Sequence, residues 1–111
     1  MYKQGDIVIV KFPFTDGSQF KKRPALVISN NKIEASEDFL LVQITSKLSN
    51  DGLSITIRKE DWLKDLPLKS YIPPHKIFTI HKSLILSKIS EVNKSFITTV
   101  ADKIFELIEV S

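Results

Sequence analysis

The chain carries a series of short apolar segments about ten residues apart, and then changes to a helical period near its C-terminal end. Segments of this length, rich in Val, Ile and Phe and bounded by Gly, Pro, Asn or Asp, are typical of β-strands. The predicted strands cover residues 7–12, 24–29, 39–44, 53–58, 70–72, 76–80 and 86–92. This order predicts a mainly β, α+β fold: a small, strongly bent sheet or barrel covered by one helix.

The C-terminal segment predicts that helix. Its apolar residues follow helical spacing, with charged residues on the opposite side. They are Phe96, Ile97, Val100, Ala101, Ile104, Phe105 and Ile108. Asn93 suits the N-cap, and Val92 with Ile97 suits a hydrophobic staple.

Several apolar side chains indicate how the core is built. The β-branched run 7–10 lacks alternation, which predicts burial on both faces of its strand. Residues 59–66 suit a helical turn, with Trp62 as a lid over the core. Phe14 and Phe20 could stack on bases if exposed, but we expect them to close the end of the core.

Composition sets broad limits on the class of protein. A length of 111 residues predicts one domain, residues 1–111, with 42% hydrophobic and 26% charged residues as in ordinary globular proteins. The absence of cysteine excludes a disulfide scaffold. The net charge of +3 tolerates a polyanionic partner without requiring one. No apolar run approaches a membrane span, and the N-terminus leads directly into a strand, so we expect a soluble cytoplasmic protein.

Most enzyme signatures are missing from the sequence. Three glycines form no phosphate-binding loop, and His, Asp and Glu show no metal-ligand spacing. No nucleophile elbow is present, although composition alone does not exclude Ser-His-Asp chemistry. We therefore expect neither a metal nor an organic cofactor.

A basic loop end that runs into a strand is the first candidate for a functional site. Arg23 is one of only two arginines beside 14 lysines, and Pro24 restrains the backbone next to it. A planar guanidinium can grip a phosphate with two hydrogen bonds, which lysine cannot do. The alternative interpretation is a solvated basic turn before a core strand.

Two hydroxyl residues, Thr45 and Ser46, follow the predicted strand 39–44. If this strand and the one that follows Arg23 are antiparallel neighbours, the start of one faces the end of the other. Arg23 and a hydroxyl would then meet at one rim and could hold a phosphate during in-line attack.

Four segments of the chain resemble the MazF/PemK family of toxins. They are Gly5-Asp6-Ile7-Val8, Lys22-Arg23-Pro24-Ala25-Leu26-Val27-Ile28, Gln43-Ile44-Thr45-Ser46 and Lys76-Ile77-Phe78-Thr79-Ile80. The similarity extends over nearly the whole chain, and the spacing between the Arg-Pro strand and the Ile-Thr-Ser strand end is its most specific part.

The resemblance implies an SH3-like barrel with an added helix, a homodimer, and the toxin of a type II toxin-antitoxin system. Such toxins are metal-independent endoribonucleases that cut single-stranded RNA at short sequences, and a cognate antitoxin neutralises them. We expect mRNA to be the substrate here. Cleavage uses the 2′-hydroxyl of the RNA and leaves a 2′,3′-cyclic phosphate and a 5′-hydroxyl.

The family motif assigns the catalytic roles to Arg23 and Thr45. Arg23 would stabilise the charged phosphorane and Thr45 would bind a phosphate oxygen. Contacts to RNA are further expected from Ser18, Lys21, Lys22 and Ser46. The proton acceptor for the 2′-hydroxyl stays unassigned, because the pKa of an arginine exceeds about 12.

One segment departs from the family pattern. Several members carry Arg-Thr-x-Asp where this chain has Phe78-Thr79-Ile80-His81. Either His81 has taken over proton transfer or the position has no role in catalysis, and we favour the second interpretation. The loop 14–22 is particular to this chain, so the RNA sequence that is cut does not follow from the resemblance.

Two other functions are compatible with the same fold. One is a non-enzymatic toxin like the gyrase-poisoning CcdB proteins, although residues 106–111 lack their Trp-Gly-Ile ending. The other is a catalytically silent barrel that binds RNA or antitoxin. Arg23 and Thr45 favour the nuclease, because a gyrase poison needs no phosphate-binding rim.

Overall fold

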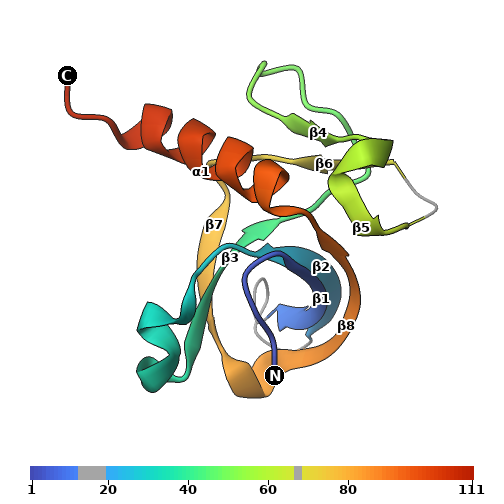
Figure 1. The fold of residues 1–111 in the computed structure, drawn as a ribbon, viewed down its shortest axis with the longest axis vertical. Coiled ribbons are helices and arrows are strands. Elements are labelled where there is room, and N and C mark those ends of the chain that lie inside the picture. Colours follow the sequence, from blue (N-terminus) through green and yellow to red (C-terminus); the bar gives the residue numbers. More distant parts are fainter. Residues whose placement is uncertain (13–19, 67–68) are drawn as a thin grey trace.

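A six-stranded antiparallel sheet forms the body of the molecule (Figure 1). The computed structural model describes residues 1–12, 20–66 and 69–111. The strand order in this sheet is β5-β8-β1-β2-β3-β7. Its strands are β1 (Asp6–Phe12), β2 (Lys21–Val27), β3 (Asp38–Gln43), β5 (Trp62–Lys64), β7 (Ile77–His81) and β8 (Ile85–Val92).

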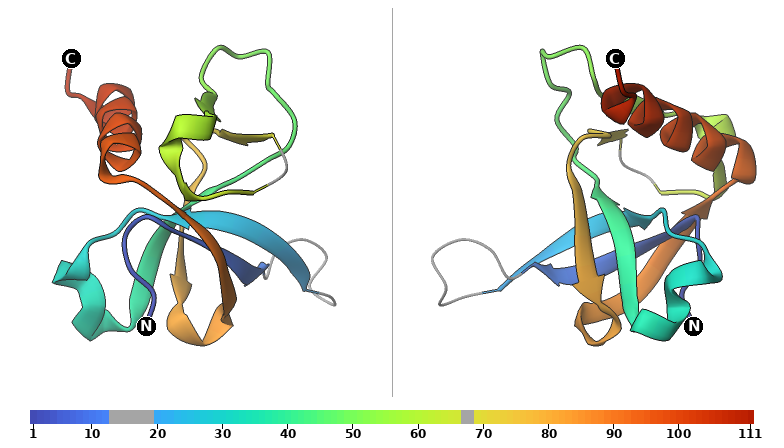
Figure 2. Two further views of the ribbon diagram at one scale, coloured as in Figure 1. Left: turned by 45° about the vertical axis from the view of Figure 1, so that its right-hand side comes forward. Right: turned by 90° about the vertical axis from the view of Figure 1, so that its left-hand side faces the viewer.

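A second layer covers one face of this sheet. It consists of the helix α1 (Lys94–Ile108) and a two-stranded sheet of β4 (Ile55–Ile57) and β6 (Ser70–Ile72), which lie on the same side of the large sheet (Figure 2). Short 3₁₀ helices, η1 (Asn31–Ser36), η2 (Lys59–Asp61) and η3 (Lys82–Leu84), connect strands. The predicted α+β class is therefore confirmed.

The large sheet curls strongly but does not close into a complete barrel (Figure 1). In the described part of the chain, the edge strand β7 pairs only with β3, and the opposite edge strand β5 pairs only with β8. The chain passes from β7 to β8 through η3, so these two strands are joined by a helical turn instead of a ladder of hydrogen bonds.

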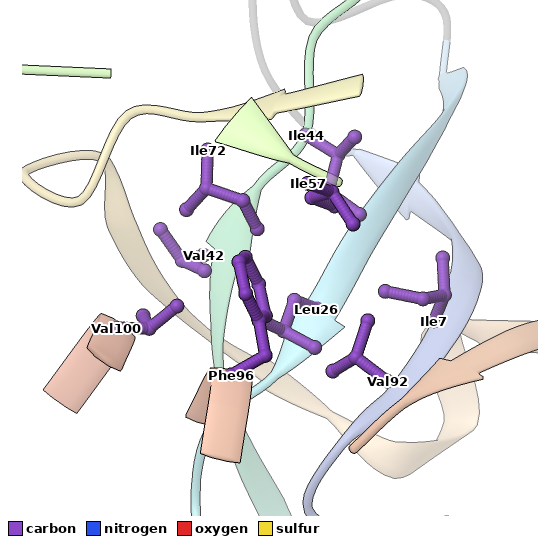
Figure 3. Packing of buried hydrophobic residues seen from close by; sticks show 9 residues of the cluster. All are labelled: Ile7, Leu26, Val42, Ile44, Ile57, Ile72, Val92, Phe96 and Val100. Carbon is purple, nitrogen blue, oxygen red and sulfur yellow. The ribbon is translucent and has the colours of Figure 1, made fainter. Parts of the chain in front are cut away.

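Alternating side chains of the sheet supply two separate cores. The first lies between the sheet, α1 and the small sheet (Figure 3), and contains Ile7, Leu26, Val42, Ile44, Ile57, Ile72, Val92, Phe96 and Val100. The second lies inside the curl and contains Val8, Val10, Ala25, Val27, Leu41, Ile80 and Ile85. Ile7 and Val8 thus enter opposite cores, which confirms the prediction that β1 is buried on both faces.

Helix α1 begins as predicted, but only its first part is covered. The Asn93 Oδ1 accepts a hydrogen bond from the Phe96 N–H at 2.8 Å, which confirms the N-cap. Phe96 and Val100 are buried. By contrast, Phe105 is 61% and Ile108 69% exposed, because the first core extends along the helix only as far as Ile104.

Strand β2 begins at Lys21, so the prediction that Pro24 starts the strand is wrong. The Pro24 carbonyl accepts a hydrogen bond from the Ile44 N–H at 3.3 Å. In a strand, the N–H and C=O of one residue point toward the same neighbour, and β3 has already ended at Gln43. The missing N–H of proline therefore faces the end of the β2–β3 ladder, where its loss costs little.

Three further expectations are corrected or limited. Residues 59–66 form η2 followed by β5, not one helical turn, although Trp62 does pack against the first core as a lid. Residues 31–36, which lie between two predicted strands, form η1. Phe20 is 60% exposed and does not close the core, while Phe14 lies outside the described residues.

None of the helices in residues 1–12, 20–66 and 69–111 is both long enough and apolar enough to span a membrane.

Candidate functional site

The pairing of β2 with β3 brings Arg23 and Thr45 to the same end of the sheet. The two strands are antiparallel, with Ala25 opposite Gln43. Continuing this register by two residues places Arg23 opposite Thr45, with both side chains on the face that carries Ala25. The expected meeting of the start of one strand with the end of its neighbour is confirmed.

Backbone hydrogen bonds fix Thr45 in position. Its N–H donates to the Tyr71 carbonyl at 3.0 Å, and the Tyr71 N–H donates to the Thr45 carbonyl at 2.8 Å. The Thr45 Oγ1 accepts a hydrogen bond from the Lys47 N–H at 3.1 Å. This bond orients the hydroxyl oxygen without using the hydroxyl proton, which can be donated to a ligand.

Arg23 is half-buried and lies over an aromatic ring. Its Cζ is 5.8 Å from the centroid of the Phe12 ring, within the range of a cation–π contact. The buried Nε of Arg23 has no hydrogen-bond partner among the residues that the structure describes. A buried donor without a partner costs about 1–3 kcal/mol, so the guanidinium is placed to bind an acceptor other than the residues that the structure describes. Arg23 therefore differs from a solvated basic turn.

The departure at Phe78 has a physical explanation in this structure. Phe78 lies opposite Leu41 on β7, and its ring packs edge to face against Phe12, with centroids 4.9 Å apart. Phe78 thus supports the Phe12 ring, over which the Arg23 guanidinium lies. An arginine at residue 78 would place a second positive charge beside the first.

Thr45 also lines a cleft of about 230 Å³. The polar residues that line it are Gln43, Thr45, Lys47, Ser49, Asp51, Ser54, His75 and Lys76. Of these, only Thr45 was among the site residues predicted from the sequence, and two of the residues that were missed are His75 and Lys76. They belong to the segment between two strands, and only the pairing of distant strands brings that segment beside Thr45.

A rigid turn presents His75 to the cleft. Pro73 and Pro74 are buried, and the Lys76 N–H donates to the Pro73 carbonyl at 3.0 Å. The Lys76 carbonyl in turn accepts a hydrogen bond from the Gln43 N–H at 3.1 Å. The backbone on both sides of His75 is therefore held, while its side chain is exposed.

The charges in the cleft are mixed. The backbone N–H of Leu53 donates to the Asp51 carboxylate at 3.0 Å and lowers the pKa of Asp51, and the nearby His75 lowers this pKa further. Lys47 and Lys76 add positive charge at the same opening. The cleft thus combines two ammonium groups, a carboxylate, an imidazole and three hydroxyls.

The predicted RNA contacts are distributed over both faces of β2. Lys21 lies opposite Phe12 and is on the Arg23 side of the strand, whereas Lys22 lies opposite Lys11 and points to the other side. Both lysines are exposed, as is Ser46. Ser18 lies outside the described residues.

His81 lies far from this cleft. It is opposite Asp38 at the far end of β7, five residues beyond Lys76, which is about 17 Å in an extended strand. Its Nδ1 accepts a hydrogen bond from the Ser83 N–H at 3.1 Å, and its Nε2 is 3.4 Å from a Glu37 carboxylate oxygen. These contacts cap η3 and connect it to η1.

Within the residues that the structure describes, no group of three or more His, Cys, Asp or Glu side chains is arranged to hold a metal ion.

Solved structures with similar folds share less than a fifth of their sequence with this chain. An endoribonuclease in complex with its cognate antitoxin, from a mycobacterial species, superposes with a TM-score of 0.78 at 16% identity, over 100% of this chain and 98% of that one. The MazE–MazF complex of Deinococcus radiodurans gives 0.79 at 18% identity, over 99% and 98%. The Mycobacterium tuberculosis toxin MazF-mt6 gives 0.72 at 15% identity, over 96% and 98%.

Sequence comparison gives a family match as well. The family described as "PemK-like, MazF-like toxin of type II toxin-antitoxin system" matches residues 3–108. No curated protein sequence matches the chain.

Proposed function

The chain belongs to the PemK-like, MazF-like toxins of type II toxin-antitoxin systems, and from this we propose that it is an endoribonuclease that cleaves single-stranded RNA, such as mRNA, in the cytoplasm. The observation that carries the proposal is the half-buried Arg23, whose buried Nε has no hydrogen-bond partner in the described part of the chain and which shares a sheet face with Thr45, a residue that lines a cleft. Similar structures named as endoribonucleases support the same reaction class.

In the proposed reaction, the RNA 2′-hydroxyl attacks the adjacent phosphorus. Arg23 stabilises the negative charge that builds up on the phosphorane oxygens, because its fork of donors reaches two oxygens at once. Thr45 donates a hydrogen bond to one of these oxygens and keeps the phosphate in line for attack. The products are a 2′,3′-cyclic phosphate and a 5′-hydroxyl, and no metal takes part.

We further propose that the toxin acts as a homodimer. The C-terminal end of α1 exposes Phe105, Leu107 and Ile108, an apolar surface that a second copy could cover. Two copies would double the positive charge that Lys21 and Arg23 provide. Light scattering at micromolar concentration should give the mass of a dimer; a fully active monomer would contradict this proposal.

We propose that a cognate antitoxin neutralises the toxin by placing an acidic, apolar segment over the same cleft. The positive charges of Lys47, Lys76 and Arg23 are complementary to such a segment. The complexes formed by similar structures support this partner class.

A defined single-stranded RNA incubated with the purified protein in EDTA tests the nuclease proposal. We expect cleavage, with fragments that polynucleotide kinase labels directly, without prior phosphatase treatment, because their 5′ ends carry hydroxyls. The variant Arg23→Ala, purified in the same way, controls for contaminating nucleases. Loss of cleavage in EDTA would contradict the metal-independent mechanism, and no cleavage under any condition would favour a silent binding protein.

A further inference from the structure

We propose that His75 accepts the proton of the RNA 2′-hydroxyl in this chain, an assignment that rests on the proposed nuclease function. His75 lines the same cleft as Thr45, and the two are brought together by the pairing of Gln43 with the turn that precedes β7. The reaction needs a proton acceptor, and neither Arg23 nor Thr45 is suited to that role.

The other charged groups of the cleft are poorer acceptors. Lys47 and Lys76 carry ammonium groups, which donate hydrogen bonds but have no lone pair to accept a proton. The Asp51 carboxylate already accepts the Leu53 N–H at 3.0 Å, and its lowered pKa makes it a weaker base. A histidine side chain, by comparison, exchanges a proton between about pH 5 and 8.

The surroundings of His75 suit a proton acceptor. Its backbone is held by the buried Pro73 and Pro74 and by the Lys76 N–H bond to the Pro73 carbonyl, while His75 itself is exposed and lines the cleft. Asp51 lines the same cleft as His75.

The step balances within RNA, enzyme and water. The 2′-oxygen forms a bond to phosphorus while its proton moves to a neutral ring nitrogen of His75. The bond between phosphorus and the 5′-oxygen breaks with its electron pair on that oxygen, which takes a proton from water. The His75 imidazolium then returns its proton to the hydroxide that remains, so enzyme and solvent are restored.

The two histidines of the chain, His75 and His81, provide a matched comparison. We expect His75→Gln to lower kcat about 100-fold or more, as is usual for loss of a general base, and His81→Gln to leave kcat close to wild type. In the wild type the rate should fall toward low pH as the acceptor becomes protonated. That acidic decline should persist in His81→Gln and disappear in His75→Gln, and added imidazole should partly restore the rate of His75→Gln.

Binding of an RNA with 2′-deoxy substitution, which cannot be cleaved, separates proton transfer from a structural or binding role. We expect the affinity of His75→Gln for this RNA to be within about twofold of that of the wild type, because the ring takes part in proton transfer and not in binding. A retained rate, an unchanged acidic decline, or a loss of binding that matches the loss of rate would each overturn the assignment. Absence of cleavage by the wild type would instead overturn the proposed function, so the two failures are distinct.

Discussion

The two ends of the curled sheet differ in whether their charged groups are paired with one another or available to a ligand. At the end where β1 begins, the Asp6 carboxylate is 1% exposed and fully engaged. It accepts the Lys3 N–H at 2.9 Å and lies 3.3 Å from the Lys3 Nζ and 3.2 Å from the Lys88 Nζ. Both lysines also contact Glu91, so the charges there form a closed network.

At the end where β1 finishes, the charged groups stay available. The Arg23 Nε is buried without a partner in the described part of the chain, and His75 and Lys76 line an open cleft. Buried polar groups normally find partners within the fold, so one without a partner among the described residues, on the sheet face of Thr45, indicates a ligand. The end of the sheet at Asp6, called the paired end, stabilises the sheet. We infer that the end at Arg23 performs the function.

The strongest test of this contrast is Arg23. We expect Arg23→Lys to be nearly as damaging as Arg23→Ala, with cleavage about 100- to 1,000-fold slower, because a point charge does not replace the planar fork. Arg58→Ala serves as the control, since Arg58 is exposed and paired with Glu60 at 3.4 Å. Measured cleavage rates decide the point; a Lys variant with wild-type turnover would show that Arg23 supplies only charge.

Asp6 tests whether the charge network at the end where β1 begins stabilises the fold. We expect Asp6→Asn to lower the free energy of unfolding by about 2 kcal/mol, since charge-assisted hydrogen bonds to a buried carboxylate are lost. The cleavage rate per folded molecule should stay the same. Urea unfolding measures the change, with Glu106→Gln, which breaks an exposed pair at 3.8 Å, expected to have little effect. Equal stability of Asp6→Asn and wild type would show that the network is unimportant.

Lys21 and Lys22 test which face of β2 contacts RNA at the Arg23 end of the sheet. Lys21 shares a strand face with Arg23 and Lys22 does not, so Lys21→Ala should weaken RNA binding several-fold more than Lys22→Ala. Loss of one phosphate contact should make the slope of the logarithm of the RNA-binding constant against the logarithm of salt concentration shallower by about 0.7. Titration of uncleavable RNA at several salt concentrations measures both slopes, and identical effects of the two variants would contradict the assignment of faces.

The smallest expected effect concerns Glu37 at the paired end. Lys82, and then His81, lower the pKa of Glu37. A carboxyl whose pKa is lower in the folded state contributes stability above its ordinary pKa and loses it as pH falls through the folded value. Between pH 6 and 3, the melting temperature of the wild type should therefore fall slightly more than that of Glu37→Gln. Asp102→Asn, at an exposed position of α1, should follow the wild type; parallel curves for all three would contradict the prediction.

Signals that act within a few residues were predictable from the sequence. Asn93 caps α1 because its side chain reaches an N–H only three residues away, and the apolar run in β1 fills both cores because strand side chains alternate. Arg23 and Thr45 could be selected as candidates because their chemistry and their places at strand ends are written in the sequence. Whether they carry out the reaction is decided by the proposed assays.

The tertiary structure decided what depends on contacts between distant segments. The placement of His75 in the Thr45 cleft follows from the register between β3 and β7, which no local pattern encodes. The packing of Phe78 on Phe12 joins strands that are far apart in the chain. Such pairings depend on the sum of many weak contacts across the sheet, so only the assembled fold shows which candidate residues meet.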